Sequence, residues 1–194
     1  MESFDKAPGF LHTGALSPTK PTDHMPFATP IIVRVDFDNL AHARDFLTLL
    51  DHYAHHPMGG GTGLSPYAKA HLIERLQDRL DFVALLAYVD GHPAGLINLI
   101  EGFSTFSARP VLNIHDIVVH QDFRGQGIAK QLLLAAEHIA HERDCCKLTL
   151  EVLSGNQLAR QLYEKVGYQA YTLDPAMGQA MFFEKKLPAA TQAG

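Results

Sequence analysis

The spacing of apolar residues changes along this chain, and each spacing predicts one kind of element. Short apolar or alternating runs predict strands at residues 31–35, 82–89, 92–103, 111–119, 147–153, 168–173 and 180–187. Apolar spacings of three and four predict helices from residues 40, 66, 128 and 157. The resulting order is β-α-α-β-β-β-α-β-α-β-β. It predicts an α/β (α+β) domain with about seven strands and about four helices.

Local signals set the limits of these elements. Asp38 or Asn39 can cap the first helix, which is expected to stop near Pro57. Ser65 followed by proline predicts the start of the second helix, which should run to about Leu80. Asp90-Gly91 predicts a tight hairpin between two strands.

The two ends of the chain differ from its body. Residues 1–29 contain several prolines and no apolar period, so we expect an irregular arm that lies on the body or pairs with a partner. The sequence therefore leaves open whether the chain forms a homodimer. Residues 30–187 are expected to form a single domain, and residues 188–194 a flexible tail.

Composition narrows the function classes. Of the 194 residues, 46% are hydrophobic, which is enough for one core. The net charge of -5 argues against general nucleic-acid binding. No long apolar run predicts a membrane span or an export signal. We expect the adjacent Cys145 and Cys146 to be reduced thiols. Because reduced thiols are typical of the cytoplasm, the sequence predicts a cytoplasmic protein. His52, His55 and His56 lack a spaced acidic or thiol partner, so no metal site is expected.

The most informative stretch is a basic, glycine-rich turn between the strand at 111–119 and the helix from 128. The unpaired N–H groups of a helix N-terminus favour phosphate, and Arg124 adds a charged donor. Gly125 and Gly127 let the ligand approach the backbone. Lys130 stands where a dinucleotide fingerprint needs glycine or alanine, and no Gly-Lys-Ser/Thr of a P-loop is present. The turn predicts a phosphorylated cofactor of another kind.

Two motifs carry a resemblance to the GNAT family of N-acetyltransferases. The turn resembles the family's acyl-CoA loop, Gln/Arg-x-x-Gly-x-Gly/Ala, through Arg124, Gly127 and Ala129. The run 156–168 resembles the family's second signature, Asn-x-x-Ala-x-x-Leu-Tyr-x-x-x-Gly-Phe/Tyr, at every key position. The spacing of Asn156, Ala159 and Tyr163 puts them on one helix face, where they can meet an amide-rich pantetheine arm.

The resemblance implies the GNAT fold, in which a twisted, mostly antiparallel sheet holds acetyl-CoA between two splayed strands. It also implies direct transfer of acetyl to a primary amine in a ternary complex, with a small-molecule acceptor favoured over a protein. A catalytically silent acetyl-CoA sensor or assembly subunit is the alternative, and a plain interaction domain ranks last. The expected cofactor-binding residues are Ile117, Val118, Val119, Arg124, Gly125, Gln126, Gly127, Ile128, Ala129, Lys130, Asn156 and Ala159.

The resemblance also assigns catalytic roles. Tyr163 is the expected general acid for the departing thiolate. Asn113 stands where histone-type relatives carry a glutamate base, and His115 stands in the base position of polyamine-type relatives, with Glu101 as the fallback. Strand alternation would put Asn113 and His115 on the same face as Ile117 and Val119.

The acceptor site is expected at the first two helices and the loop between them. An aromatic and imidazole cluster runs into a glycine-rich segment there, which suits a substrate gate. The expected substrate-binding residues are Tyr53, His56, Met58, Phe103 and Asp116.

Overall fold

The structure is a computed structural model that describes residues 29–172, 174, 176, 178, 181–185 and 187. The predicted N-terminal arm, apart from residue 29, and the tail at 188–194 lie outside the described residues. The strands are β1 (Ile31–Arg34), β2 (Phe82–Val89), β3 (His92–Ser104), β4 (Arg109–Val119) and β5 (Leu148–Leu150). The helices are α1 (Leu40–His55), α2 (Pro66–Gln77), α3 (Ile128–Glu142) and α4 (Gln157–Lys165). Two short 3-10 turns, η1 (Pro57–Gly59) and η2 (Gln121–Phe123), complete the order.

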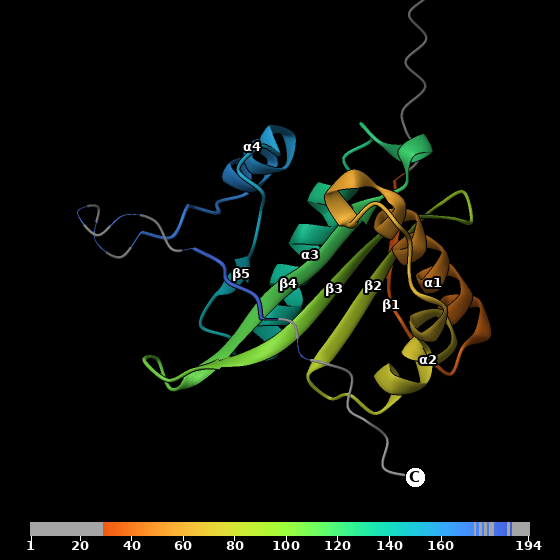
Figure 1. The fold of residues 1–194 in the computed structure, drawn as a ribbon, viewed down its shortest axis with the longest axis horizontal. Helices are drawn as coiled ribbons and strands as arrows, with labels where there is room; N and C mark the ends of the chain where they lie inside the picture. The colour runs from red at the N-terminus through yellow and green to blue at the C-terminus, as the bar shows by residue number, and fades with distance from the viewer. Residues whose placement is uncertain are drawn as a thin grey trace, which may run out of the picture.

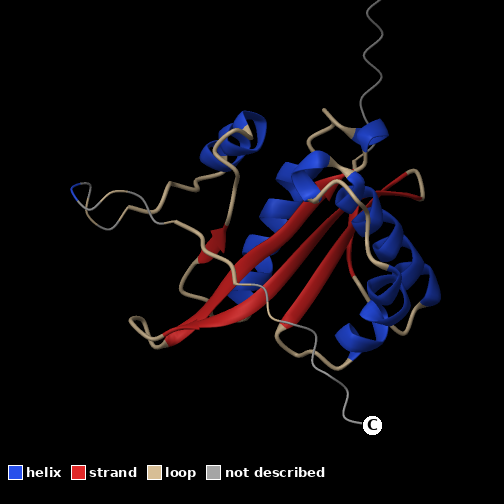
Figure 2. Ribbon diagram, viewed as in Figure 1, coloured by secondary structure: helices blue, strands red, loops and turns tan. Residues whose placement is uncertain are grey.

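The strands form one mixed sheet in the order β1-β2-β3-β4-β5 (Figures 1 and 2). The first four strands are antiparallel neighbours, and β5 joins β4 in parallel. The predicted tight hairpin is confirmed, because Asp90 and Gly91 both have positive φ, 49° and 77°, as a type I′ turn requires. Asn39 and Ser65 cap α1 and α2 through their side chains, as the sequence predicted.

The expected strand count was too high, since the described residues form five strands rather than about seven. The described parts of the two missing segments, residues 168–172 and 181–185, adopt no regular structure. Met181, Phe182 and Phe183 are all largely exposed instead of being buried at alternate positions. Apolar composition alone does not make a strand without a cross-strand partner.

Two apolar clusters lie on opposite faces of the sheet. The larger joins α3 and α4 to one face, and we call this the α3 face. The other joins α1 and α2 to the opposite face, here called the α1 face, with Phe46 and Leu49 fully buried. The α1 and α2 helices pack against the β1–β3 side of the sheet, as the views in Figures 1 and 2 show. The α1 face over β4 and β5 is therefore less covered by helices.

A buried polar contact ties α1 to β2. The hydroxyl of Tyr88 donates a hydrogen bond of 2.9 Å to Asp45 Oδ2, and Asp45 also pairs with Arg44. Burial, followed by the carboxylate of Asp45, raises the pKa of Tyr88 to about 12. The native state therefore holds the Tyr88 proton more tightly than the unfolded chain does.

Replacing Tyr88 with Phe should lower the free energy of unfolding by about 1–2 kcal/mol at pH 7, because Asp45 loses a donor while it stays buried. The contribution of Tyr88 to the free energy of unfolding should be fully present below a pH near 10, the pKa of a tyrosine in the unfolded chain. It should be lost as the pH rises through the native pKa of about 12. Urea unfolding at pH 7 and pH 11 measures both effects. The exposed Tyr67 gives the matched Tyr67→Phe control, and equal losses in the two variants would contradict the assignment.

Candidate active site

The glycine-rich turn forms a row of free backbone donors at the start of α3. Gly125 and Gly127 have positive φ, 79° and 78°, and Gly127 is the N-cap with no side-chain cap bond. Among the described residues, no acceptor pairs with the backbone N–H groups of residues 125–130. A Cβ at either glycine would meet no described heavy atom within 4 Å, so the space is open. Successive free N–H groups at a helix N-terminus form an anion site.

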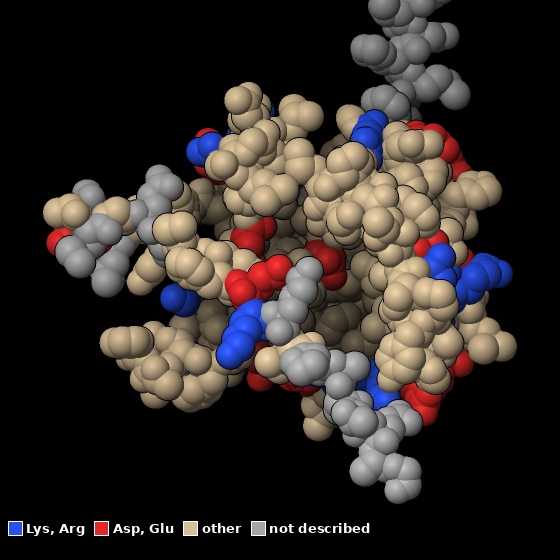
Figure 3. Space-filling view, in the orientation of Figure 1, with Lys and Arg blue, Asp and Glu red and all other residues tan. Residues whose placement is uncertain are grey.

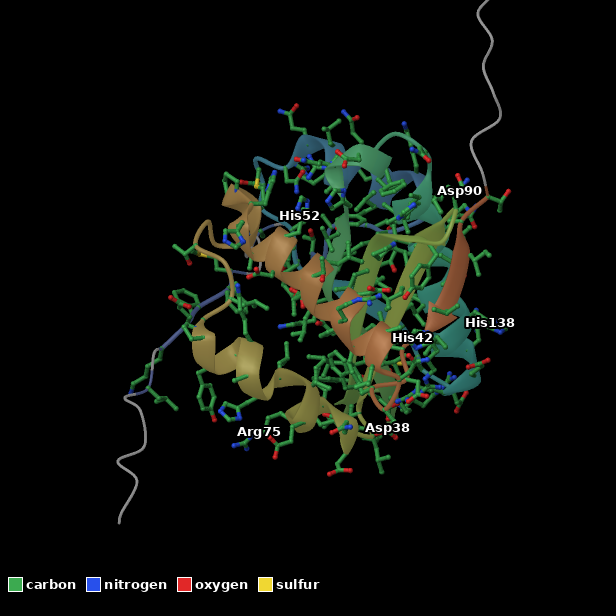
Figure 4. All side chains as sticks on the ribbon, turned by 90° about the vertical axis from the view of Figure 1, so that its right-hand side faces the viewer. Asp38, His42, His52, Arg75, Asp90 and His138 are labelled. Carbon is green, nitrogen blue, oxygen red and sulfur yellow. The ribbon has the colours of Figure 1, made fainter. Side chains whose placement is uncertain are left out.

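The end of α1 approaches this turn. The Arg124 side chain lies back toward β4, where its Nε donates to the Val119 carbonyl at 3.4 Å. His52 of α1 stacks on His120, with ring centroids 4.4 Å apart, and Figure 4 shows His52 near the end of α1. Burial lowers the pKa of His52, and the nearby positive charges of His120 and Arg124 lower it further. The His52 Nε2 atom is buried and has no partner among the described residues.

The β4 and β5 strands separate before β4 ends. They pair only at residues 112–114 of β4, opposite residues 148–150 of β5. Beyond that point β4 continues to Val119 while the chain after β5 leaves toward α4 (Figure 1). Residues 115–119 therefore present an edge with no ladder partner on the β5 side among the described residues. This is the splayed strand pair that the sequence resemblance implied.

A β-bulge at His115 corrects the expected face of the strand. Asn98 pairs with Asp116 while Leu99 pairs with Ile114, so His115 is the extra residue and is exposed. Ile117 and Val119 consequently pack in the α3-face cluster. Asn113 and Asp116 belong to the opposite, α1 face, because one inserted residue reverses the alternation.

Asp116 lies at the centre of a polar cluster. Asn98 Nδ2 donates to Asp116 Oδ2 at 2.9 Å. Burial and then the Asp116 charge raise the pKa of Tyr53 on α1. Burial and then Tyr53 raise the pKa of Tyr163 on α4. The three residues come from β4, α1 and α4.

The α4 helix uses part of its signature for its own capping. Asn156 is the N-cap, and its Oδ1 accepts from the Ala159 N–H at 3.3 Å. The amide N–H groups of Asn156 remain available for a ligand. Tyr163 is 8% exposed and packs beside Tyr168, with ring centroids 6.0 Å apart. Its hydroxyl makes no hydrogen bond to any described residue.

Two expected site residues lie elsewhere. Glu101 is on the α3 face, where its carboxylate accepts a 2.7 Å bond from Arg143 after α3. This ion pair occupies Glu101 away from Asp116, so the fallback base is not brought to the site. Phe103 lies beside the β3–β4 connection and is 64% exposed. The structure gives it no contact with Tyr53, Asp116 or Tyr163.

The loop after α1 stays next to the cluster. His56 caps η1 by accepting from the Met58 N–H, and Tyr53 donates a long 3.4 Å bond to the Met58 carbonyl. These contacts hold η1 over the α1 end of the site. Met58 itself is 42% exposed, which suits a surface that meets a ligand.

The sequence reasoning missed Asn98, Glu151 and His120. Asn98 was visible as a lone polar residue in an apolar strand. Glu151 lies in the predicted strand at 147–153 and alternates with its apolar residues, so it gave no distinct signal. The stacking of His52 and His120 joins segments 68 positions apart, and no sequence signal pointed to it.

Among the described residues, no group of three or more His, Cys, Asp or Glu residues is placed to hold a metal ion. No described helix combines the length and apolar character needed to cross a membrane.

Comparison with known proteins gives a family match. The family model described as "Acetyltransferase (GNAT) family" matches residues 49–168. The chain is 33% identical over 105 residues to the uncharacterized N-acetyltransferase YhfO of Bacillus subtilis (strain 168), covering 54% of this chain and 70% of YhfO. It is 43% identical over 56 residues to the uncharacterized N-acetyltransferase YycN of the same organism, covering 29% of this chain. The match spans only 36% of the length of YycN.

Solved structures give the same fold. An aminoglycoside acetyltransferase from an uncultured soil metagenomic sample, in complex with sisomicin, superposes with a TM-score of 0.67. That alignment covers 82% of this chain and 97% of the other, at 18% identity. At this identity the likeness concerns the fold alone.

Proposed function

Because the chain belongs to the acetyltransferase (GNAT) family, we propose that it transfers an acetyl group from acetyl-CoA to a primary amine of a small molecule. The observation that carries this proposal is the row of free backbone donors at the start of α3 beside the open edge of β4. The amine attacks the thioester directly while donor and acceptor are both bound.

The donor site runs from the turn along β4. The pyrophosphate of acetyl-CoA binds the free N–H groups of residues 125–130, and Arg124 neutralises part of its charge. Pantetheine then follows the unpaired edge at Ile117 to Val119, where strand backbone can bond its amides. The Asn156 amide and the small Ala159 border the same arm from α4. Gln126, Ala129 and Lys130 border the phosphates, whereas the Ile128 side chain is buried and contributes only its N–H.

The acceptor amine binds on the α1 face, bordered by Tyr53, His56 and Met58. An ammonium ion must lose a proton before it can attack, and the thiolate must gain one when it leaves. Tyr163 supplies the proton to sulfur. Its raised pKa keeps the phenol protonated through neutral pH. Asp116 orients the ammonium, and His115, exposed beside it in the bulge, accepts the proton and passes it to solvent.

His115→Gln should lower the ratio of turnover to Michaelis constant by roughly ten- to a thousandfold, since a neutral amide cannot accept the proton. The acidic limb of the pH profile of this ratio should become flatter. Asp116→Asn should mainly raise the Michaelis constant, because it removes the charge that holds the ammonium. One substrate must be used throughout, because its own ionisation also shapes that limb. An unchanged limb in His115→Gln with a lost limb in Asp116→Asn would move the base to Asp116. Glu101→Gln, whose ion pair lies on the other face, should keep the native profile.

The proposed activity is tested by free-thiol release from acetyl-CoA with a panel of small amines. Release that depends on both the amine and the protein supports it. Binding of acetyl-CoA without release for any amine would favour a silent sensor instead. Peptides with a free N-terminus or a lysine belong in the same panel, and a preference for them would contradict the small-molecule acceptor.

A further inference from the structure

We propose that Glu151, held by Asn113, is a second ammonium subsite that selects acceptors carrying at least two amines, such as linear polyamines or amino sugars. This inference rests on the proposed acetyl transfer to an amine. Asp116 holds the reacting amine, and Glu151 holds its neighbour on the same molecule.

Glu151 is fixed in place from β4. The Asn113 Nδ2 atom donates to both Glu151 carboxylate oxygens, at 3.4 and 3.2 Å, and also contacts Thr149 Oγ1 at 3.2 Å. Asn113 and Thr149 are direct partners in the parallel ladder. The amide thus bridges the two strands just before they separate. An exposed carboxylate held by an amide gains a defined position.

Glu151 and Asp116 face the same side of the sheet. Asn113 lies opposite the buried Leu112 and Ile114, so its contact with Glu151 is on the α1 face. Asp116 bonds to Asn98 on that face as well. Asp116 lies three residues after Asn113 on β4, and both side chains are on the α1 face. Two carboxylates on one face can each meet one ammonium group of the same molecule.

The carboxylates of Asp116 and Glu151 are not neutralised by a described residue. Within the described part of the chain, no ion pair involves Asp116 or Glu151. Figure 3 shows acidic atoms in the hollow of this face, with basic atoms beside some of them. Two unneutralised carboxylates around a hollow attract a ligand of opposite charge.

A separate observation at Asn98 also points to a bound donor. Asn98 is 3% exposed, and its Nδ2 is used by Asp116. Its Oδ1 is buried and has no partner among the described residues. Because both atoms belong to one planar amide, this free acceptor lies next to the Asp116 carboxylate. A substrate ammonium has three donors, and one bound to Asp116 would lie next to this acceptor.

The test compares three probes of similar length: butylamine, aminobutanol and diaminobutane with one amine at each end. The native protein should turn over diaminobutane with a ratio of turnover to Michaelis constant roughly ten- to a hundredfold above the other two, the range for a bond to a charged group. Glu151→Gln should remove this preference and leave butylamine turnover within about twofold. Glu142→Gln, on α3 at the other face, makes the same change in net charge and should keep the preference.

Binding of the same probes to the complex with CoA, followed by calorimetry, separates this subsite from the proposed reaction. In one outcome, diaminobutane binds preferentially and Glu151→Gln loses this preference, but no thiol is released from acetyl-CoA. That outcome would overturn the reaction and keep the subsite. Thiol release with equal use of all three probes would overturn the subsite and keep the reaction. Equal losses in Glu151→Gln for butylamine and diaminobutane would also overturn it, because Glu151 would then serve the site as a whole.

Discussion

Gly127→Asp should abolish measurable acetyl-CoA binding, with a dissociation constant raised roughly a hundredfold or more, or at least about 2.7 kcal/mol. Gly127 is the N-cap of α3, and the N–H groups after it have no acceptor among the described residues. A carboxylate there would occupy the phosphate position with the same charge and would cap those groups itself. Calorimetry with acetyl-CoA measures the effect, and the native protein should bind with low-micromolar to sub-millimolar affinity.

The chain supplies a matched control for backbone strain. Gly91 has φ 77°, against 78° for Gly127, and a Cβ at either position meets no described atom within 4 Å. It sits in the β2–β3 turn beside Asp90, well apart from His52 in Figure 4. Gly91→Asp should therefore cost similar stability and leave acetyl-CoA affinity unchanged. Similar affinities for native protein and Gly127→Asp would refute the turn as the phosphate site.

Tyr163→Phe should lower turnover by roughly ten- to a thousandfold and leave acetyl-CoA affinity nearly intact. The variant removes the proton donor and keeps a ring that is 8% exposed in the α3-face cluster. Burial and Tyr53 raise the pKa of Tyr163, so the native protein should keep its acid through neutral pH and lose turnover only at strongly alkaline pH. Turnover and its alkaline limb are measured by free-thiol release.

Tyr168 gives the control for loss of a neighbouring hydroxyl. Its ring lies 6.0 Å from that of Tyr163, and its buried hydroxyl has no partner among the described residues. Tyr168→Phe should leave turnover at the native level and should not destabilise the protein, because it removes an unsatisfied polar atom. Native turnover in Tyr163→Phe would make Tyr163 a packing residue, with the thiolate leaving unaided.

Local chemistry explains why much of the fold could be predicted. The caps Asn39 and Ser65, the Asp90-Gly91 hairpin and the glycine-rich turn each depend on residues next to one another in the sequence. The order of elements from β1 to α4 followed from apolar periodicity for the same reason. The described residues of the two last predicted strands form no strand. Strand formation needs a partner, and the apolar pattern contains no information about whether one is available.

The sequence by itself determined the family, the glycine-rich turn and the helix that carries Tyr163, because each depends on a short contiguous motif. The tertiary structure alone decided which polar residues meet. The bulge at His115 reversed the strand alternation, which put Asp116 on the α1 face, while Arg143 pairs with Glu101 on the other face. A bulge and a long-range ion pair depend on register and packing between distant segments, and sequence spacing records neither.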